Sequence, residues 1–101
     1  MTSVYFNEPM VYAYLLKFGE VYTVRHYPGD TLTHPVKVKS KFTGVTVRLA
    51  TVGLFNSDMV AWYVDKSGFK RCQDWIDAIL RQHTNYDTLW LLRAVVVMYE
   101  Q

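Results

Sequence analysis

Four interruptions by glycine or proline divide the sequence into short segments, and they constrain the fold more than any other feature of the chain. They lie at Gly19, Pro28-Gly29, Thr43-Gly44 and Ser67-Gly68. Glycine and proline mark turns and helix ends, so the regular elements are expected to begin and end near them. The intervening segments carry either the alternation of a strand or the spacing of a helix. The 101 residues are therefore predicted to form one domain with a single core.

The periodicity of these segments predicts the order β-α-β-β-β-α-α-β. Strands are expected at 3–6, 21–25, 36–41, 45–55 and 87–100, and helices at 9–18, 59–66 and 70–83. Asn7 and Asn56 are expected to cap the first two helices, because an asparagine side chain accepts hydrogen bonds from the free N–H groups of a first turn. The order predicts an α+β domain with about three helices, whose antiparallel strands form a small, highly curved sheet or barrel.

Composition excludes several classes of protein. Half of the residues are apolar and 16% are aromatic, which argues against disorder. Cys72 is the only cysteine, so no intrachain disulfide forms. His26, His34 and His83 lack metal-ligand spacing, and neither a metal nor a cofactor is expected. No apolar run approaches the roughly 20 residues that span a bilayer, and the N-terminus lacks a secretion signal. The sequence therefore predicts a soluble, cytoplasmic domain without a membrane partner.

Basic residues concentrate in one part of the chain. Residues 25–48 carry five basic side chains and a single acidic one. Within them, residues 36–41 read VKVKSK, and the alternation predicts that Lys37, Lys39 and Lys41 share one face of a strand. Like charges on one face need water or an anionic partner. The row is expected either to follow a phosphate backbone or to be the solvated face of a protected edge strand.

The stretch TVRHYPGD, residues 23–30, combines polar and aromatic side chains at a strand end. Thr23 and Arg25 are two residues apart on a predicted strand, so they point to the same face. Arg25 can offer a forked donor to a phosphate or a base edge, and Tyr27 can stack on a base. In the alternative interpretation, Arg25 pairs with Asp30 across the turn and has only a structural role.

These elements in this order resemble the ASCH domain, a branch of the PUA-like superfamily, over almost the whole chain. The residues that carry the resemblance are Gly19, Thr23-Val24-Arg25, Gly29-Asp30, the strand at 44–52, Gly68-Phe69, Trp75 and the final LLRAVVVMYE. The resemblance implies a small barrel-like fold with a groove beside the first helix. It also implies binding of RNA or a modified nucleotide, at a site expected to comprise Thr23, Arg25, Tyr27 and the three lysines.

One bacterial branch of this family hydrolyses the acetyl amide of N4-acetylcytidine, using a motif of the form G-x-K-x-x-T/E-x-R and a distant Glu. Thr23 and Arg25 match the last two positions, which would make Thr23 the nucleophile. However, Gly19 lies one residue closer to Arg25 than the motif requires. Glu20 occupies the position of the Lys, and Ser67 occupies the position of the distant Glu. Without those groups a threonine hydroxyl is a weak nucleophile. The expected function is therefore binding, with an acetylcytidine-type amidohydrolase and a protein-binding module that uses exposed aromatic side chains as the alternatives.

Overall fold

The predicted order of elements is confirmed. The computed structural model describes residues 3–29, 32–83 and 88–99. Along this part, the elements are β1 (Val4–Tyr5), α1 (Pro9–Phe18), β2 (Glu20–Arg25), β3 (Thr33–Val38), β4 (Lys41–Leu54), α2 (Ser57–Tyr63), the 3-10 turn η1 (Val64–Lys66), α3 (Cys72–Gln82) and β5 (Trp90–Tyr99). The chain is thus an α+β domain. The expected ends of the last strand, Asp87 and Glu100, lie outside the described residues.

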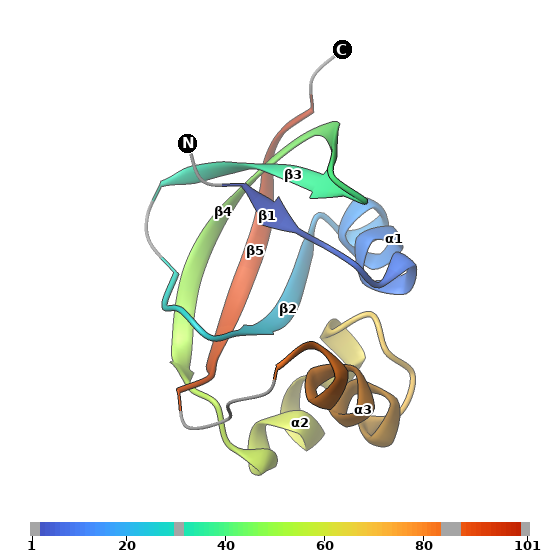
Figure 1. Ribbon diagram of the computed structural model, residues 1–101, viewed down its shortest axis with the longest axis vertical. Helices are drawn as coiled ribbons and strands as arrows, with labels where there is room; N and C mark the ends of the chain where they lie inside the picture. Colours follow the sequence, from blue (N-terminus) through green and yellow to red (C-terminus); the bar gives the residue numbers. More distant parts are fainter. Residues whose placement is uncertain (1–2, 30–31, 84–87, 100–101) are drawn as a thin grey trace.

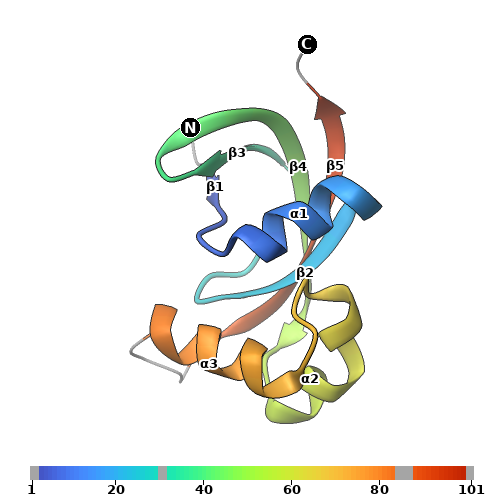
Figure 2. The ribbon, with the colours of Figure 1, turned by 90° about the vertical axis from the view of Figure 1, so that its right-hand side faces the viewer.

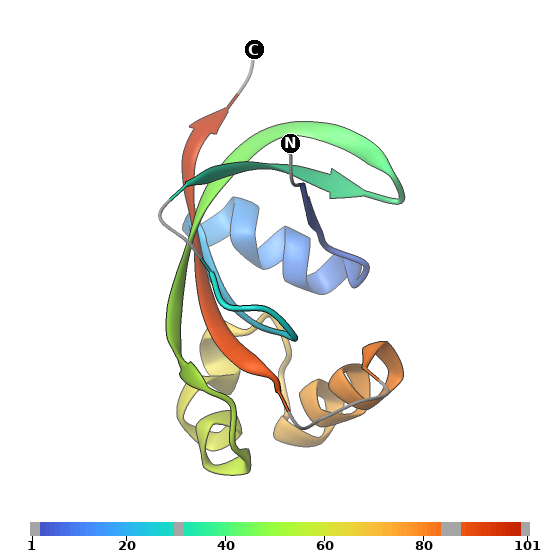
Figure 3. The same ribbon diagram turned by 60° about the vertical axis from the view of Figure 1, so that its left-hand side comes forward.

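The strands form one strongly curled sheet in the order β1-β3-β4-β5-β2 (Figure 1). It curls into a half-barrel, and α1 lies inside the curl (Figure 3). Three neighbouring pairs are antiparallel, but β1 runs parallel to β3, whereas all strands were expected to be antiparallel. α1 connects β1 to β2, which lies at the opposite edge of the sheet.

Two irregularities in the pairing of β4 with β5 accompany the curl. The register shifts between Thr46 and Val47 and again between Thr51 and Gly53. Bulges of this kind bend a strand and increase its twist. The second shift lies at Gly53, and an isolated glycine within a strand often marks a bulge.

Local signals placed two of the helix ends correctly. Gly19 ends α1 in the left-handed conformation, with φ 78°, which glycine adopts without steric cost. The Asn56 side chain caps α2 by accepting from two backbone N–H groups of its first turn. The expected cap at Asn7 is wrong. Glu8 occupies that position and makes no side-chain capping bond, and its carboxylate instead accepts a hydrogen bond from Arg81.

The strand predicted at 36–41 is wrong in its extent. β3 starts earlier and ends at Val38, and the chain reverses at Lys39 and Ser40, where φ is 51° and 66°. Lysine and serine are uncommon at positive φ, so the sequence carries no signal for this turn. A turn or a bulge is expected at Thr43-Gly44. These residues lie inside β4, where the β3–β4 register shifts between Pro35 and Lys37, so the bulge is confirmed and the turn is not.

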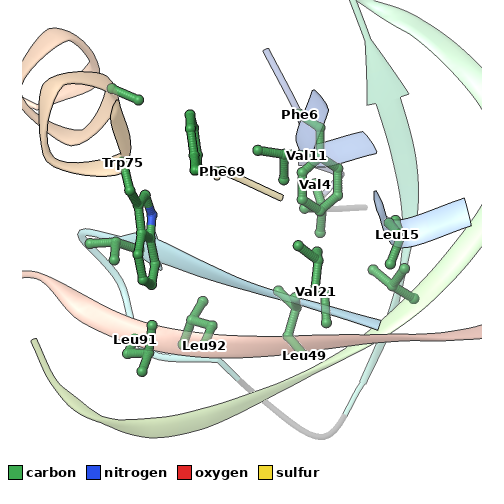
Figure 4. Packing of buried hydrophobic residues seen from close by; sticks show 14 of the residues in the cluster. Val4, Phe6, Val11, Leu15, Val21, Leu49, Phe69, Trp75, Leu91 and Leu92 are labelled. Atoms are coloured by element: carbon green, nitrogen blue, oxygen red, sulfur yellow. The ribbon is translucent and has the colours of Figure 1, made fainter. Parts of the chain in front are cut away.

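The core fills the concave side of the sheet and continues beneath the helices. Val21, Leu49 and Leu92 on the strands face α1, and Trp75 of α3 belongs to the same cluster of buried side chains (Figure 4). Figure 2 shows α1 lying between the β1–β3 part of the sheet and the helices α2 and α3. The chain between η1 and α3 approaches α1 closely: a Cβ atom at Gly68, where φ is 90°, would lie 2.8 Å from the Cα atom of Val11. A glycine is therefore required at this contact.

Candidate functional site

A small pocket lies where the ends of β1 and β2 meet the first turn of α1 and one face of α3. Its polar lining comes from Asn7, Glu8, Thr23, Arg25, Ser67 and Gln82, and its aromatic lining from Tyr5, Phe6, Tyr22, Phe69 and Trp75. The volume available inside is about 30 Å³, which holds about two water molecules. A nucleobase does not fit within this volume, so a larger ligand would contact the pocket from outside.

Thr23 and Arg25 line this pocket together, as their spacing predicts. In the β2–β5 ladder they lie opposite Leu92 and Trp90. They share a face with Val21, which is fully buried. The pocket wall also includes the first turn of α1, so the expected grouping of the two side chains beside the first helix is confirmed.

The Arg25 guanidinium is half-buried and has no carboxylate partner in the described part of the chain. Its central carbon lies 5.1 Å from the centroid of the Phe6 ring. Burial lowers the pKa of Arg25 from its usual value, and Tyr27 opposes this shift. Asp30, the predicted partner, lies outside the described residues. Within 3–29, 32–83 and 88–99, the ion pairs are Arg71–Asp74, Arg81–Glu8 and Arg93–Glu20, and none includes Arg25.

The carboxylate in the pocket lining is already paired. Glu8, the residue before α1, accepts a hydrogen bond from Arg81 of α3, with 3.0 Å between Oε1 and Nη2. This pair joins the two helices that border the pocket. Because Arg81 neutralises Glu8, the lining retains the positive charge of Arg25.

Two histidines that are far apart in the sequence come together after the end of β2, and the charge of Arg25 acts on one of them, His83. His26 follows β2 and His83 follows α3, and their ring centroids are 5.9 Å apart. The Nε2 atom of His83 lies 3.3 Å from the carbonyl oxygen of Val24. A carbonyl only accepts, so Nε2 carries the proton and donates. We call Arg25, His26 and His83 the basic cluster.

Sequence reasoning missed the basic cluster, because no local spacing relates its two histidines. Burial lowers the pKa of His83, the hydrogen bond to Val24 partly opposes this, and the charges of His26 and Arg25 lower it further. His83 therefore favours its neutral form near neutral pH.

The expected row of three lysines does not form. Lys37 lies opposite Phe42 in the β3–β4 ladder, and Lys41 immediately precedes Phe42, so Lys37 and Lys41 point to opposite faces of the sheet. Lys39 lies in the turn. The Nζ atom of Lys37 is 4.2 Å from the centroid of the Phe42 ring and 5.7 Å from that of Tyr5. Lys37 therefore packs on aromatic rings.

Tyr27 lies next to the pocket but outside its lining. It is half-buried against the core, and its ring meets that of His26 edge to face at 5.6 Å. The structure thus brings Thr23 and Arg25 together, leaves Tyr27 beside them, and disperses the lysines.

The two positions that depart from the amidohydrolase motif both have structural contacts. Glu20 forms an ion pair with Arg93 across the β2–β5 ladder. Ser67 is fully buried: its hydroxyl donates to the Val64 carbonyl oxygen at 2.6 Å and accepts from the Phe69 N–H at 3.1 Å. Neither position supplies a group that could activate a threonine hydroxyl.

A second, larger hollow lies between α2, α3 and the start of β5, and we call it the apolar cavity. Its volume is about 190 Å³, and it is lined by Phe55, Ser57, Val60, Ile76, Ile79, Leu80 and Leu89. Ile79 also lines the pocket. The two hollows therefore share a wall.

Among the described residues, no group of three or more His, Cys, Asp or Glu side chains could hold a metal ion. In the same part of the chain, no helix is long and apolar enough to cross a membrane. Comparisons with protein-family models, curated proteins and solved structures found no match. The resemblance to the ASCH domain stays a prediction.

Proposed function

We propose that this chain is an ASCH-like domain that binds RNA or a modified nucleotide, with Arg25 contacting an anionic group of the ligand at the pocket mouth. The observation that carries the proposal is the half-buried Arg25 guanidinium, which lines the pocket and pairs with no carboxylate in the described part of the chain. A partly buried cation is unfavourable without a partner. A phosphate or a base edge satisfies its forked donors.

The small volume of the pocket limits how such a ligand binds. Because about 30 Å³ cannot hold a base, the ligand presents a phosphate or a base edge to the mouth. Thr23 adds a hydroxyl in the same lining. Lys39 and Lys41, at the β3–β4 turn, add sequence-independent attraction to phosphates.

A protein-binding module is the second candidate, and the apolar cavity favours it. Leu80, on the cavity wall, is 50% exposed, and Trp62 of α2 is 67% exposed. Exposed apolar groups of this kind mark protein contacts when they are contiguous. Such binding would depend weakly on salt, whereas binding to phosphates weakens steeply as salt rises.

Replacement of Arg25 by lysine tests the proposal. Arg25→Lys keeps the charge but loses the fork, so we expect affinity for short RNAs, acetylcytidine-containing ones included, to fall roughly 5- to 100-fold. The melting temperature should change little. Fluorescence anisotropy at several salt concentrations measures the affinity, and calorimetry measures the melting temperature.

Arg48→Lys is the matched control, because Arg48 is exposed on β4 and absent from the pocket lining. It should leave RNA affinity unaltered. Equal affinities of wild type and Arg25→Lys for every RNA would overturn the proposal. Binding of a protein partner without salt dependence would support the second candidate.

A further inference from the structure

We infer that the basic cluster is a proton-linked oxyanion site, at which Arg25 and the imidazoles of His26 and His83 bind one phosphodiester or similar group more tightly as the pH falls. The inference deepens the proposed function: it rests on that function for the identity of the ligand, but not for the existence of the anion site. The cluster draws on the end of β2 and on the residue after α3.

The geometry favours an anion over a metal ion. Two imidazoles whose rings are 5.9 Å apart could in principle share a cation. However, Arg25 is close enough for its positive charge to act on His83, and it would repel a metal. No third ligand joins them among the described residues. An oxyanion is attracted by all three groups, because a protonated histidine donates from both ring nitrogens.

Protonation of His83 is compatible with its contact in the fold. Its Nε2–H group already donates to the Val24 carbonyl oxygen. The incoming proton therefore binds Nδ1, and the bond to the Val24 carbonyl persists in the imidazolium. Uptake of a proton adds a charge and a second donor without breaking this contact.

Among the residues that the structure describes, the other ionisable groups around the cluster do not cancel its charge. Tyr27 meets the His26 ring at its edge. Glu8 is paired with Arg81. Among the described residues, the charges that act on His83 are those of Arg25 and His26, and both oppose its protonation.

Linkage fixes the sign of the pH dependence. In the free protein, burial and the neighbouring charges lower the pKa of His83, so it is neutral near pH 7. A bound anion stabilises the imidazolium and raises that pKa, so binding takes up protons. Affinity then rises as pH falls, by up to about tenfold per pH unit for each proton taken up.

The test uses a short RNA without a terminal phosphate, because its diesters keep their charge between about pH 5.5 and 8. We expect tighter binding at pH 5.5 than at pH 7.5, and a shallower pH slope in His26→Gln, in His83→Gln and most of all in the double variant. His34 remains in each variant. Lys17→Gln, at the far end of α1, removes one charge elsewhere and should keep the slope.

A second measurement needs neither RNA nor a variant. Titration of wild-type His83 by NMR, with and without inorganic sulfate, should show that sulfate raises the pKa of His83. A pH slope retained in full by the double variant would overturn the inference, as would a His83 resonance that does not respond to sulfate. If sulfate raises the pKa of His83 but no RNA binds at any pH, the anion site stands and the proposed function fails.

Discussion

The pocket and the apolar cavity share the side chain of Ile79, but they differ in size and in the polarity of their linings. The cavity is several times larger, about 190 Å³ against about 30 Å³. Yet the pocket contains the polar and charged side chains, whereas Ser57 is the polar residue of the cavity lining. Size alone therefore does not identify a binding site. An apolar void chiefly forgoes packing contacts, whereas a desolvated charge requires a partner of defined chemistry.

Removal of the shared wall should have the largest effect. Ile79 is 6% exposed, and Ile79→Ala should lower the free energy of unfolding by about 2–4 kcal/mol. It should also join the two hollows and weaken RNA binding at the pocket. Urea denaturation measures the stability.

Leu80→Ala is the matched control for Ile79→Ala. Leu80 is the next residue of α3. It lines the apolar cavity but not the pocket, and it is half exposed. Leu80→Ala should lower the free energy of unfolding by less than half as much as Ile79→Ala, and it should leave RNA binding intact. Equal effects of the two substitutions would show that Ile79 does not separate the pocket from the apolar cavity.

A smaller effect is expected from the ion pair that borders the pocket. Arg81→Ala should cost up to about 1 kcal/mol of stability, because its side chain is largely exposed. It also frees the Glu8 carboxylate in the same lining as Arg25. The freed Glu8 carboxylate should compete with the RNA for Arg25. The free energy of RNA binding should therefore weaken by more than the free energy of unfolding falls.

Arg71→Ala provides the comparison, because it breaks the exposed ion pair between Arg71 and Asp74 at the start of α3. It should leave RNA affinity unchanged. An Arg81→Ala protein that binds as tightly as wild type would indicate that Glu8 does not reach Arg25.

The smallest effect concerns the stability of the unliganded protein as a function of pH. The folded-state pKa of His83 is lowered, chiefly by burial, whereas the unfolded value is about 6.5. Below about pH 6.5 the unfolded chain binds the proton first, so stability falls until the folded pKa is reached. The melting temperature of wild type should therefore decrease more between pH 7.5 and 5.5 than that of His83→Gln. Parallel curves would contradict this assignment.

Local sequence signals determined the elements and part of the pocket. Gly19 and Asn56 fixed helix ends because each satisfies backbone geometry or hydrogen bonds within a few residues. The two-residue spacing of Thr23 and Arg25 placed both side chains on one face. The same kind of reasoning failed at Lys39-Ser40, because side chains that rarely adopt positive φ form the turn and leave the alternation unbroken.

The sequence by itself thus determined the order of helices and strands, the α+β class and the shared face of Thr23 and Arg25. The tertiary structure alone decided that β1 runs parallel to β3, that Arg81 neutralises Glu8, and that His83 reaches the carbonyl of Val24. Periodicity and capping act over a few residues, so a sequence can display them directly. Contacts between distant segments depend on how α1 and α3 pack against the curled sheet, and no local pattern of residues encodes that packing.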